Sequence, residues 1–158
     1  MEAAQYPYSL KFSLATLGVL VILMLIVMQG VGPNNPAFAY VVYGFAGVVF
    51  ISLTTVIIFK RLLPALRGDI ALQLDEEGIS DYVKEVSINW KDIKEINLVR
   101  GRSASIMRVD MKWESDYGSQ IAIYLRWIKG NDDEIYETTL AYFDQWLETG
   151  SNMTDEGD

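Results

Sequence analysis

The residues between Lys11 and Lys60 include no charged side chain, so nearly a third of the chain is suited to hydrocarbon rather than to water. A turn-forming segment, Gln29–Pro36, interrupts this stretch once, with two Gly, two Pro and two Asn. The apolar run on each side is close to the length that a bilayer requires, about 20 residues at 1.5 Å per residue. The sequence therefore predicts a transmembrane helical hairpin, with helices at about residues 12–28 and 37–63.

Four basic residues border this hairpin: Lys11 precedes the first helix, and Lys60, Arg61 and Arg67 follow the apolar part of the second. An excess of Lys and Arg near helix ends marks the cytoplasmic side of a membrane, and the connecting loop carries no charge. We therefore expect a protein of the bacterial inner membrane with both termini in the cytoplasm. We also expect the three residues after the second helix to contact lipid head groups.

A cleaved signal peptide is the alternative interpretation of the first helix, because Ala37-Phe38-Ala39 resembles a cleavage site. The apolar segment before it is longer than the usual core of about 7–15 residues. The mature chain would also begin directly in another span. Both arguments favour retention of the first helix.

Small side chains on the second helix, at Gly44 and Gly47, allow another helix to approach closely. The first helix, through Ala15 or Gly18, is the expected partner, and another molecule is the alternative. The uncharged spans give no sign of an ion path or a proton relay. A transporter or channel is therefore disfavoured.

The chain contains no Cys and no His, which excludes thiol nucleophiles, disulfides, His-based triads and thiolate or imidazole metal sites. We expect no cofactor and no metal. From Gly68 onward there are nine basic and twenty acidic residues, a net charge of −11. Such a domain would be repelled by nucleic acid, whose phosphates require Lys and Arg. Nucleic-acid binding is therefore not expected.

Alternating apolar residues after Gly68 predict a series of half-buried strands. In the first, Ile70, Leu72 and Leu74 share one face while Ala71 and Gln73 share the other, and Asp75–Gly78 forms a hairpin turn. The expected strands are Ile70–Leu74, Ile79–Val83, Val86–Trp90, Ile93–Val99, Ser105–Trp113 and Gln120–Ile128.

The last predicted element is an amphipathic helix. Asn131 and the acidic residues after it suit a helix start, an apolar stripe follows, and Gly150 suits its end. Ser151–Asp158 is expected to be a disordered acidic tail. A sheet with one apolar face must be covered, and this helix is the available cover. We therefore predict an α+β protein: residues 1–67 form the hairpin region, and residues 68–150 form a β-sandwich or small barrel capped by the helix.

Two segments and the terminal helix resemble the bacterial pleckstrin-homology-like (PH-like) domains, including small proteins with two spans before such a domain. The segments are Ala71-Leu72-Gln73-Leu74-Asp75-Glu76-Glu77-Gly78-Ile79 and Ser87-Ile88-Asn89-Trp90-Lys91-Asp92-Ile93-Lys94-Glu95-Ile96. The resemblance implies a membrane-tethered recognition module without a shared enzymatic activity. Eukaryotic relatives bind phosphoinositides through basic residues on the first strands and their loop. Because the turn here is Asp75-Glu76-Glu77, that role is not carried over.

The remaining basic residues gather later in the domain, and they could form a surface for a partner or a lipid: Arg100, Arg102, Arg108 and Lys112. A solvated strand face is the simpler interpretation of the same pattern. Two groups of carboxylates could in principle do acid–base work, Asp110 with Glu114 and Asp116, and Asp132–Glu134. Both groups lie at turns or at a helix start, where acidic residues are common, so we do not expect an enzyme.

These observations favour a non-enzymatic protein-interaction module at the cytoplasmic face, with its hairpin surrounded by membrane lipids. It would serve as an adaptor, as a subunit of a membrane complex, or as an immunity protein that neutralises a toxin. The acidic domain suits a basic protein partner, and a homo-oligomer is compatible with the sequence. The alternative is sensing of a lipid or small ligand at the membrane surface.

Overall fold

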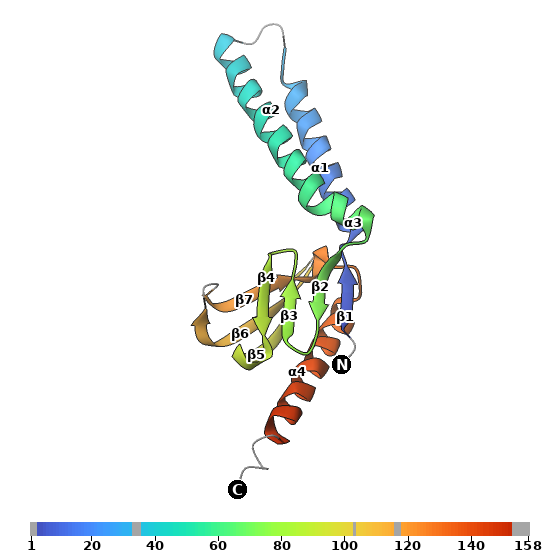
Figure 1. Cartoon of the computed structure of the whole chain (residues 1–158). Helices are drawn as coiled ribbons and strands as arrows, with labels where there is room; N and C mark the ends of the chain where they lie inside the picture. Colours follow the sequence, from blue (N-terminus) through green and yellow to red (C-terminus); the bar gives the residue numbers. More distant parts are fainter. Residues whose placement is uncertain (1–2, 33–35, 103, 116–117, 153–158) are drawn as a thin grey trace. The chain divides into compact units, whose positions relative to one another are not determined.

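Figure 1 shows the computed structural model of the chain, which describes residues 3–32, 36–102, 104–115 and 118–152. The chain forms two compact units. One consists of Leu10–Asp69, and the other combines Met1–Ser9 with Ile70–Asp158. The expectation that residues 1–67 all belong to the hairpin region is therefore wrong for the first nine residues, which belong to the β-rich domain.

The predicted hairpin is present. Helix α1 (Leu10–Gln29) is followed by α2 (Ala37–Ile57), which continues through a π-helical turn, η1 (Ile58–Leu62), into α3 (Leu63–Arg67). The 20 residues of α1 and the 31 residues of Ala37–Arg67 are each long and apolar enough to span a membrane. Almost none of their side chains is buried within the described structure, whereas a core helix of a water-soluble protein would be mostly buried. This outward apolar surface is suited to lipid.

The second helix continues past Pro64, because the helical turn before this proline is a wider π turn. Proline has no backbone N–H, so the carbonyl of Lys60, four residues earlier, loses its usual helical donor. The π turn directly before Pro64 accommodates this break. The helix ends at Gly68, whose φ of 74° is left-handed, and the Asp69 N–H donates to the Pro64 carbonyl at 2.9 Å.

The domain begins with a four-stranded antiparallel sheet in the order β1-β2-β3-β4. Its strands are β1 (Ala4–Pro7), β2 (Ile70–Leu74), β3 (Gly78–Asp81) and β4 (Val86–Asn89). Strand β1 was not expected from the sequence. It pairs with β2 from Ala4 opposite Leu74 to Pro7 opposite Ile70, so the whole of Leu10–Asp69 is inserted between two neighbouring strands.

The second sheet contains β5 (Ile93–Arg100), β6 (Ser105–Ser115) and β7 (Gly118–Tyr124), paired antiparallel in that order. Strand β7 ends earlier than expected, because a short 3-10 turn, η3 (Leu125–Trp127), follows it. Among the described residues no strand pairing closes the two sheets into a barrel. The barrel alternative is therefore wrong, and the domain consists of two sheets and a helix.

The inner faces of both sheets form the core with one side of α4 (Asp132–Asn152). Buried core side chains include Leu72, Leu74, Ile79, Ile88, Ile93, Met107, Val109, Ile123, Ile135 and Phe143. Ala71, expected on the solvent side, is also fully buried. Strand β2 has a neighbour on each side, and a methyl group between larger side chains retains no exposed surface.

The start of α4 agrees with the prediction and its end does not. Asn131 Oδ1 accepts a hydrogen bond from the Asp133 N–H at 3.0 Å, as a capping residue should. Gly150 was expected to end the helix, but α4 continues to Asn152. The predicted tail is thus helical at Ser151 and Asn152, and residues 153–158 lie outside the described residues.

The predicted turn between β2 and β3 is confirmed. Asp75 Oδ1 accepts hydrogen bonds from the N–H groups of Glu77 at 2.9 Å and of Gly78 at 3.1 Å. A Cβ added at Gly78 would overlap the carbonyl of Ile88 on β4. The close approach of these two backbones therefore requires glycine at this position.

Candidate functional site

A pocket of about 260 Å³ lies between the β2–β3 turn and the C-terminal half of α4. Three segments far apart in the sequence build it: the turn, the residue after β4, and the helix. The lining residues are Glu76, Trp90, Tyr142, Gln145, Trp146 and Thr149.

Trp90 forms the rigid floor of the pocket. Its side chain is 1% exposed, and its Nε1–H donates to the carbonyl of Asp75 at 2.8 Å. Its ring packs against Phe143 of α4 at a centroid distance of 6.1 Å. Ile93 is fully buried as well. Trp90 lines the pocket although it is a core residue, because one edge of the core is open here.

Trp146 forms one wall and is held from two sides. It stacks on Phe143 with a centroid distance of 6.4 Å and an interplanar angle of 6°. The ammonium of Lys112 lies 5.7 Å from the centre of the Trp146 ring and donates to the Lys91 carbonyl at 2.8 Å. The stacking on Phe143 and the contact with Lys112 both favour this orientation of the Trp146 ring.

Charges of both signs lie around this pocket: Glu76 lines it, and the ammonium of Lys112 lies 5.7 Å from the ring of Trp146. Glu76 places a carboxylate among the lining aromatic rings. Asp144 and Glu148 are exposed on the same half of α4. The carbonyl end of a helix also carries partial negative charge. A carboxylate beside aromatic faces is the combination that binds an ammonium or a guanidinium group.

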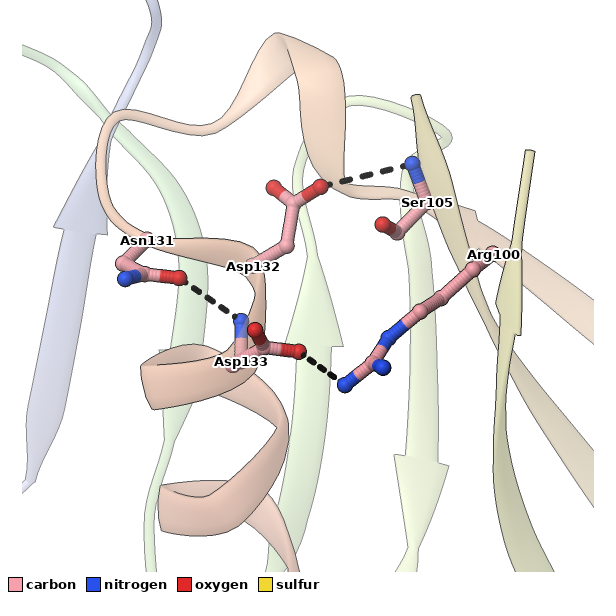
Figure 2. A network of polar contacts seen from close by, with 5 residues as sticks. All are labelled: Arg100, Ser105, Asn131, Asp132 and Asp133. Atoms are coloured by element: carbon pink, nitrogen blue, oxygen red, sulfur yellow. Dashed lines mark hydrogen bonds and ion pairs between the residues drawn. The ribbon is translucent and has the colours of Figure 1, made fainter. Parts of the chain in front are cut away.

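The structure describes no group of three or more acidic side chains that could hold a metal ion. Of the carboxylates considered from the sequence, Asp110 and Glu114 lie on β6, and Asp116 lies outside the described residues. The group at the start of α4 is structural in part. Figure 2 shows that Asp132 accepts from the Ser105 N–H at 3.3 Å and that Asp133 pairs with Arg100 at 2.8 Å. These contacts fasten the start of α4 to the β5–β6 turn.

The four basic residues predicted as one surface have different surroundings. Arg100 is paired with Asp133, although both side chains remain largely exposed, and Arg102 is exposed beyond the end of β5. Arg108 is exposed on β6, opposite Asn97 on one side and Ala122 on the other. Lys112 belongs to the pocket through Trp146. Of the four, only Lys112 contacts a lining residue of the pocket, and it does not itself line the pocket.

The two glycines predicted to pack within the hairpin do not do so. A Cβ added at Gly18, Gly44 or Gly47 would meet no atom within 4 Å, which corrects the expectation that α1 approaches α2 closely there. The close approach lies instead at Gly30, where a Cβ would come within 2.7 Å of the Tyr43 hydroxyl oxygen. Contact of Gly44 and Gly47 with another molecule stays a prediction.

The predicted head-group residues lie at the open end of the hairpin. Lys60 and Arg61 belong to η1, and Arg67 belongs to the last turn of α3. The hydroxyl of Ser13 lies 3.5 Å from the carbonyl oxygen of Arg61. The start of α1, with Lys11, therefore lies at the same level of the hairpin as η1, and the basic residues of both helices form one band.

Sequence reasoning missed a second collection of basic and aromatic side chains, which we term the basic–aromatic cluster: Tyr82, Lys84, Tyr124, Arg126, Trp127 and Lys129. Lys84 Nζ lies 4.6 Å from the centre of the Tyr124 ring. The guanidinium carbon of Arg126 lies 5.7 Å from that ring and 5.9 Å from the ring of Trp127. The only local signal was Arg126-Trp127-Ile128-Lys129, in which basic residues border a tryptophan.

Comparisons of the chain with protein-family models, with characterised proteins and with solved structures found no match.

Proposed function

We propose that this protein is a non-enzymatic interaction module anchored in a bacterial inner membrane. In this proposal the hairpin spans the bilayer with both termini in the cytoplasm, and the domain binds a basic segment of a protein partner. The partner inserts a Lys or Arg side chain into the pocket between the β2–β3 turn and α4. Such a module would act as an adaptor, as a subunit of a membrane complex, or as an immunity protein.

The membrane topology is supported by the band of basic residues at the open end of the hairpin. Lys11, Lys60 and Arg61 lie at the end where the chain enters α1 and leaves the second helix. The loop between the helices carries no charge. This asymmetry is the one that orients helices with their basic ends in the cytoplasm.

We propose in addition that the domain is PH-like, an interpretation based on the order of its elements, two antiparallel sheets followed by a single terminal helix. If the resemblance holds, the first strand is β1 and not β2. The first connection between strands is then the inserted hairpin region, not the acidic turn Asp75–Gly78. The acidity of that turn therefore no longer argues against lipid contact elsewhere on the domain.

The observation that carries the proposal is the aromatic pocket with Glu76 among its lining residues. Trp90 and Trp146 are held by hydrogen-bonding or stacking contacts, so little ordering is required when a ligand binds. A cation over an aromatic face contributes about 0.5–2 kcal/mol, depending on its desolvation. Because Glu76 is exposed, an ion pair with its carboxylate adds about 0–1 kcal/mol.

The test uses the full-length protein in detergent micelles and a fluorescent Lys- and Arg-rich peptide, with a Glu-substituted peptide of equal length as the opposite probe. We expect the basic peptide alone to bind. We expect Glu76→Gln to weaken its binding by up to about fivefold, since an exposed charge pair contributes at most about 1 kcal/mol.

Glu77→Gln is the matched control, because Glu77 is the adjacent exposed residue and does not line the pocket. Equal weakening by both substitutions would show that only net charge matters and would contradict the pocket. Lipid that co-purifies in a fixed ratio, together with no peptide binding, would favour the alternative function, sensing of a lipid or small ligand.

A further inference from the structure

The domain has a defined end at which the chain leaves it and returns. Ser9 is joined by one peptide bond to Leu10, the first residue of α1, and Asp69 is joined to Ile70, the first residue of β2. Pro7 of β1 lies opposite Ile70 in the strand register. The exit and the return of the chain are therefore neighbours at one end of the first sheet, which we term the attachment end.

Two other segments are hydrogen-bonded to this attachment end. The Ser9 N–H donates to the Trp127 carbonyl at 2.7 Å, and the Lys129 N–H donates to the Pro7 carbonyl at 2.8 Å. The Tyr8 hydroxyl donates to the Tyr82 carbonyl at 2.9 Å. The β3–β4 turn and residues 125–129 thus lie beside the two points where the domain meets the hairpin.

These same two segments carry the basic–aromatic cluster. Lys84, Arg126 and Lys129 are exposed, and Tyr82 is 46% exposed. The acidic groups nearest in the chain are Glu85, exposed beside Lys84, and Asp81, which is buried and accepts from the N–H groups of Val83 and Lys84. The exposed acid Asp69 is joined to Ile70 at the same end, so three exposed basic residues stand against two exposed acids. This surface is therefore less negative than the domain as a whole, which is strongly acidic.

We propose that the basic–aromatic cluster docks on the anionic lipid head groups of the membrane that holds the hairpin. The inference rests on the membrane-spanning part of the proposed function and goes beyond it. Trp and Tyr side chains prefer the boundary between head groups and hydrocarbon, where an apolar ring and a polar atom are both accommodated. Lys and Arg beside a membrane are attracted to anionic lipids. Both peptide bonds that join the domain to the hairpin, Ser9–Leu10 and Asp69–Ile70, are at this end of the domain.

Docking of the attachment end also orients the candidate pocket. Strand β2 runs from Ile70 at the attachment end to Leu74, and the turn with Glu76 follows. Five residues of strand extend about 16 Å. The acidic pocket is therefore held on the side of the domain away from the lipid, where it is open to a partner and is separated from the negative head groups.

The test compares full-length protein in nanodiscs of phosphatidylcholine with protein in nanodiscs containing phosphatidylcholine and phosphatidylglycerol in a 3:1 ratio. Amide hydrogen exchange is measured for residues 82–85 and 125–130. At low salt we expect at least about fivefold slower exchange of both segments in the anionic nanodiscs. The difference should shrink as salt is raised to about 0.5 M, where charges are screened within a few Å.

The triple variant Lys84→Gln, Arg126→Gln, Lys129→Gln should lose this difference. The matched control Lys91→Gln, Lys94→Gln, Arg102→Gln removes three exposed basic side chains elsewhere and should keep it. Unchanged exchange of residues 105–111 in β6 would show that each variant is folded.

Equal exchange in the two lipids, or equal loss in the two triple variants, would overturn the docking surface and leave the pocket untouched. A chain that does not enter nanodiscs would overturn both the docking surface and the proposed anchor. If the chain enters nanodiscs normally and the Glu76→Gln variant shows weakened peptide binding, the pocket is supported independently of the docking surface. Failure of the docking surface can therefore be told apart from failure of the proposed function.

Discussion

The hairpin and the β-rich domain use apolar side chains in opposite ways. In the hairpin these side chains face outward, and Phe38 and Val41 are 70% and 73% exposed. In the domain Leu72, Ile79 and Ile93 are 0% exposed. The choice of side chain at an exposed hairpin position therefore depends mainly on the apolar environment outside the helix. The choice at a buried domain position depends on the shapes of the side chains packed around it. The following substitutions test that difference, from the largest expected effect to the smallest.

A glycine-to-alanine substitution should separate the two regions most clearly. At Gly78 the new Cβ would overlap the Ile88 carbonyl, so the strands must move apart. We expect Gly78→Ala to lower the free energy of unfolding of the domain by about 3 kcal/mol or more. Chemical denaturation in detergent, followed by tryptophan fluorescence, measures this change.

Gly44→Ala is the control in the hairpin, where the new Cβ would meet open space. It should leave the unfolding of the domain unchanged. Equal destabilisation by both substitutions would mean that the hairpin and the domain unfold as one unit.

Two tyrosines offer a smaller and closely matched test. The Tyr8 hydroxyl donates to the Tyr82 carbonyl at 2.9 Å in the domain, and the Tyr40 hydroxyl donates to the Gly32 carbonyl at 2.8 Å in the hairpin. We expect Tyr8→Phe to lower the free energy of unfolding of the domain by about 1 kcal/mol. Tyr40→Phe should leave it unchanged, and the reverse result would place Tyr8 with the hairpin and not with the domain.

The smallest effect is expected at the surface of the domain. Arg100 and Asp133 form an ion pair of 2.8 Å, but their side chains are 72% and 55% exposed. Solvent screening leaves such a pair about 0–1 kcal/mol, so we expect Arg100→Gln to cost less than about 0.5 kcal/mol. A loss above about 1.5 kcal/mol in denaturation would show that this pair governs the docking of α4, and that exposure does not set the scale in this domain.

The parts of the fold that follow from local sequence were predictable. A run of residues without charge is sufficient to indicate α1 and α2, because a helix long and apolar enough for a bilayer has the same requirement at every position. The β2–β3 turn and the burial of Trp90 were likewise readable, from an acidic Gly-containing turn and from strand alternation.

The parts that depend on contacts between distant residues were not predictable. Strand β1 has four residues, and its partner β2 begins more than sixty residues later, so no local pattern identifies it. The pocket joins Glu76 to Trp146, and the basic–aromatic cluster joins Lys84 to Arg126. Each set is assembled by strand pairing and helix packing. The expected basic surface failed for the same reason, since closeness in sequence did not bring Arg100 and Lys112 into one environment.

The insertion of Leu10–Asp69 between β1 and β2 sets an order of events during synthesis. Strand β1 leaves the ribosome before the hairpin, yet its hydrogen-bonding partner does not exist until both helices have been made. At a translation rate of about 5–20 residues per second, β2 is synthesised several seconds after β1. Completion of the first sheet therefore follows translation of the hairpin, and β1 remains without its partner strand throughout that interval.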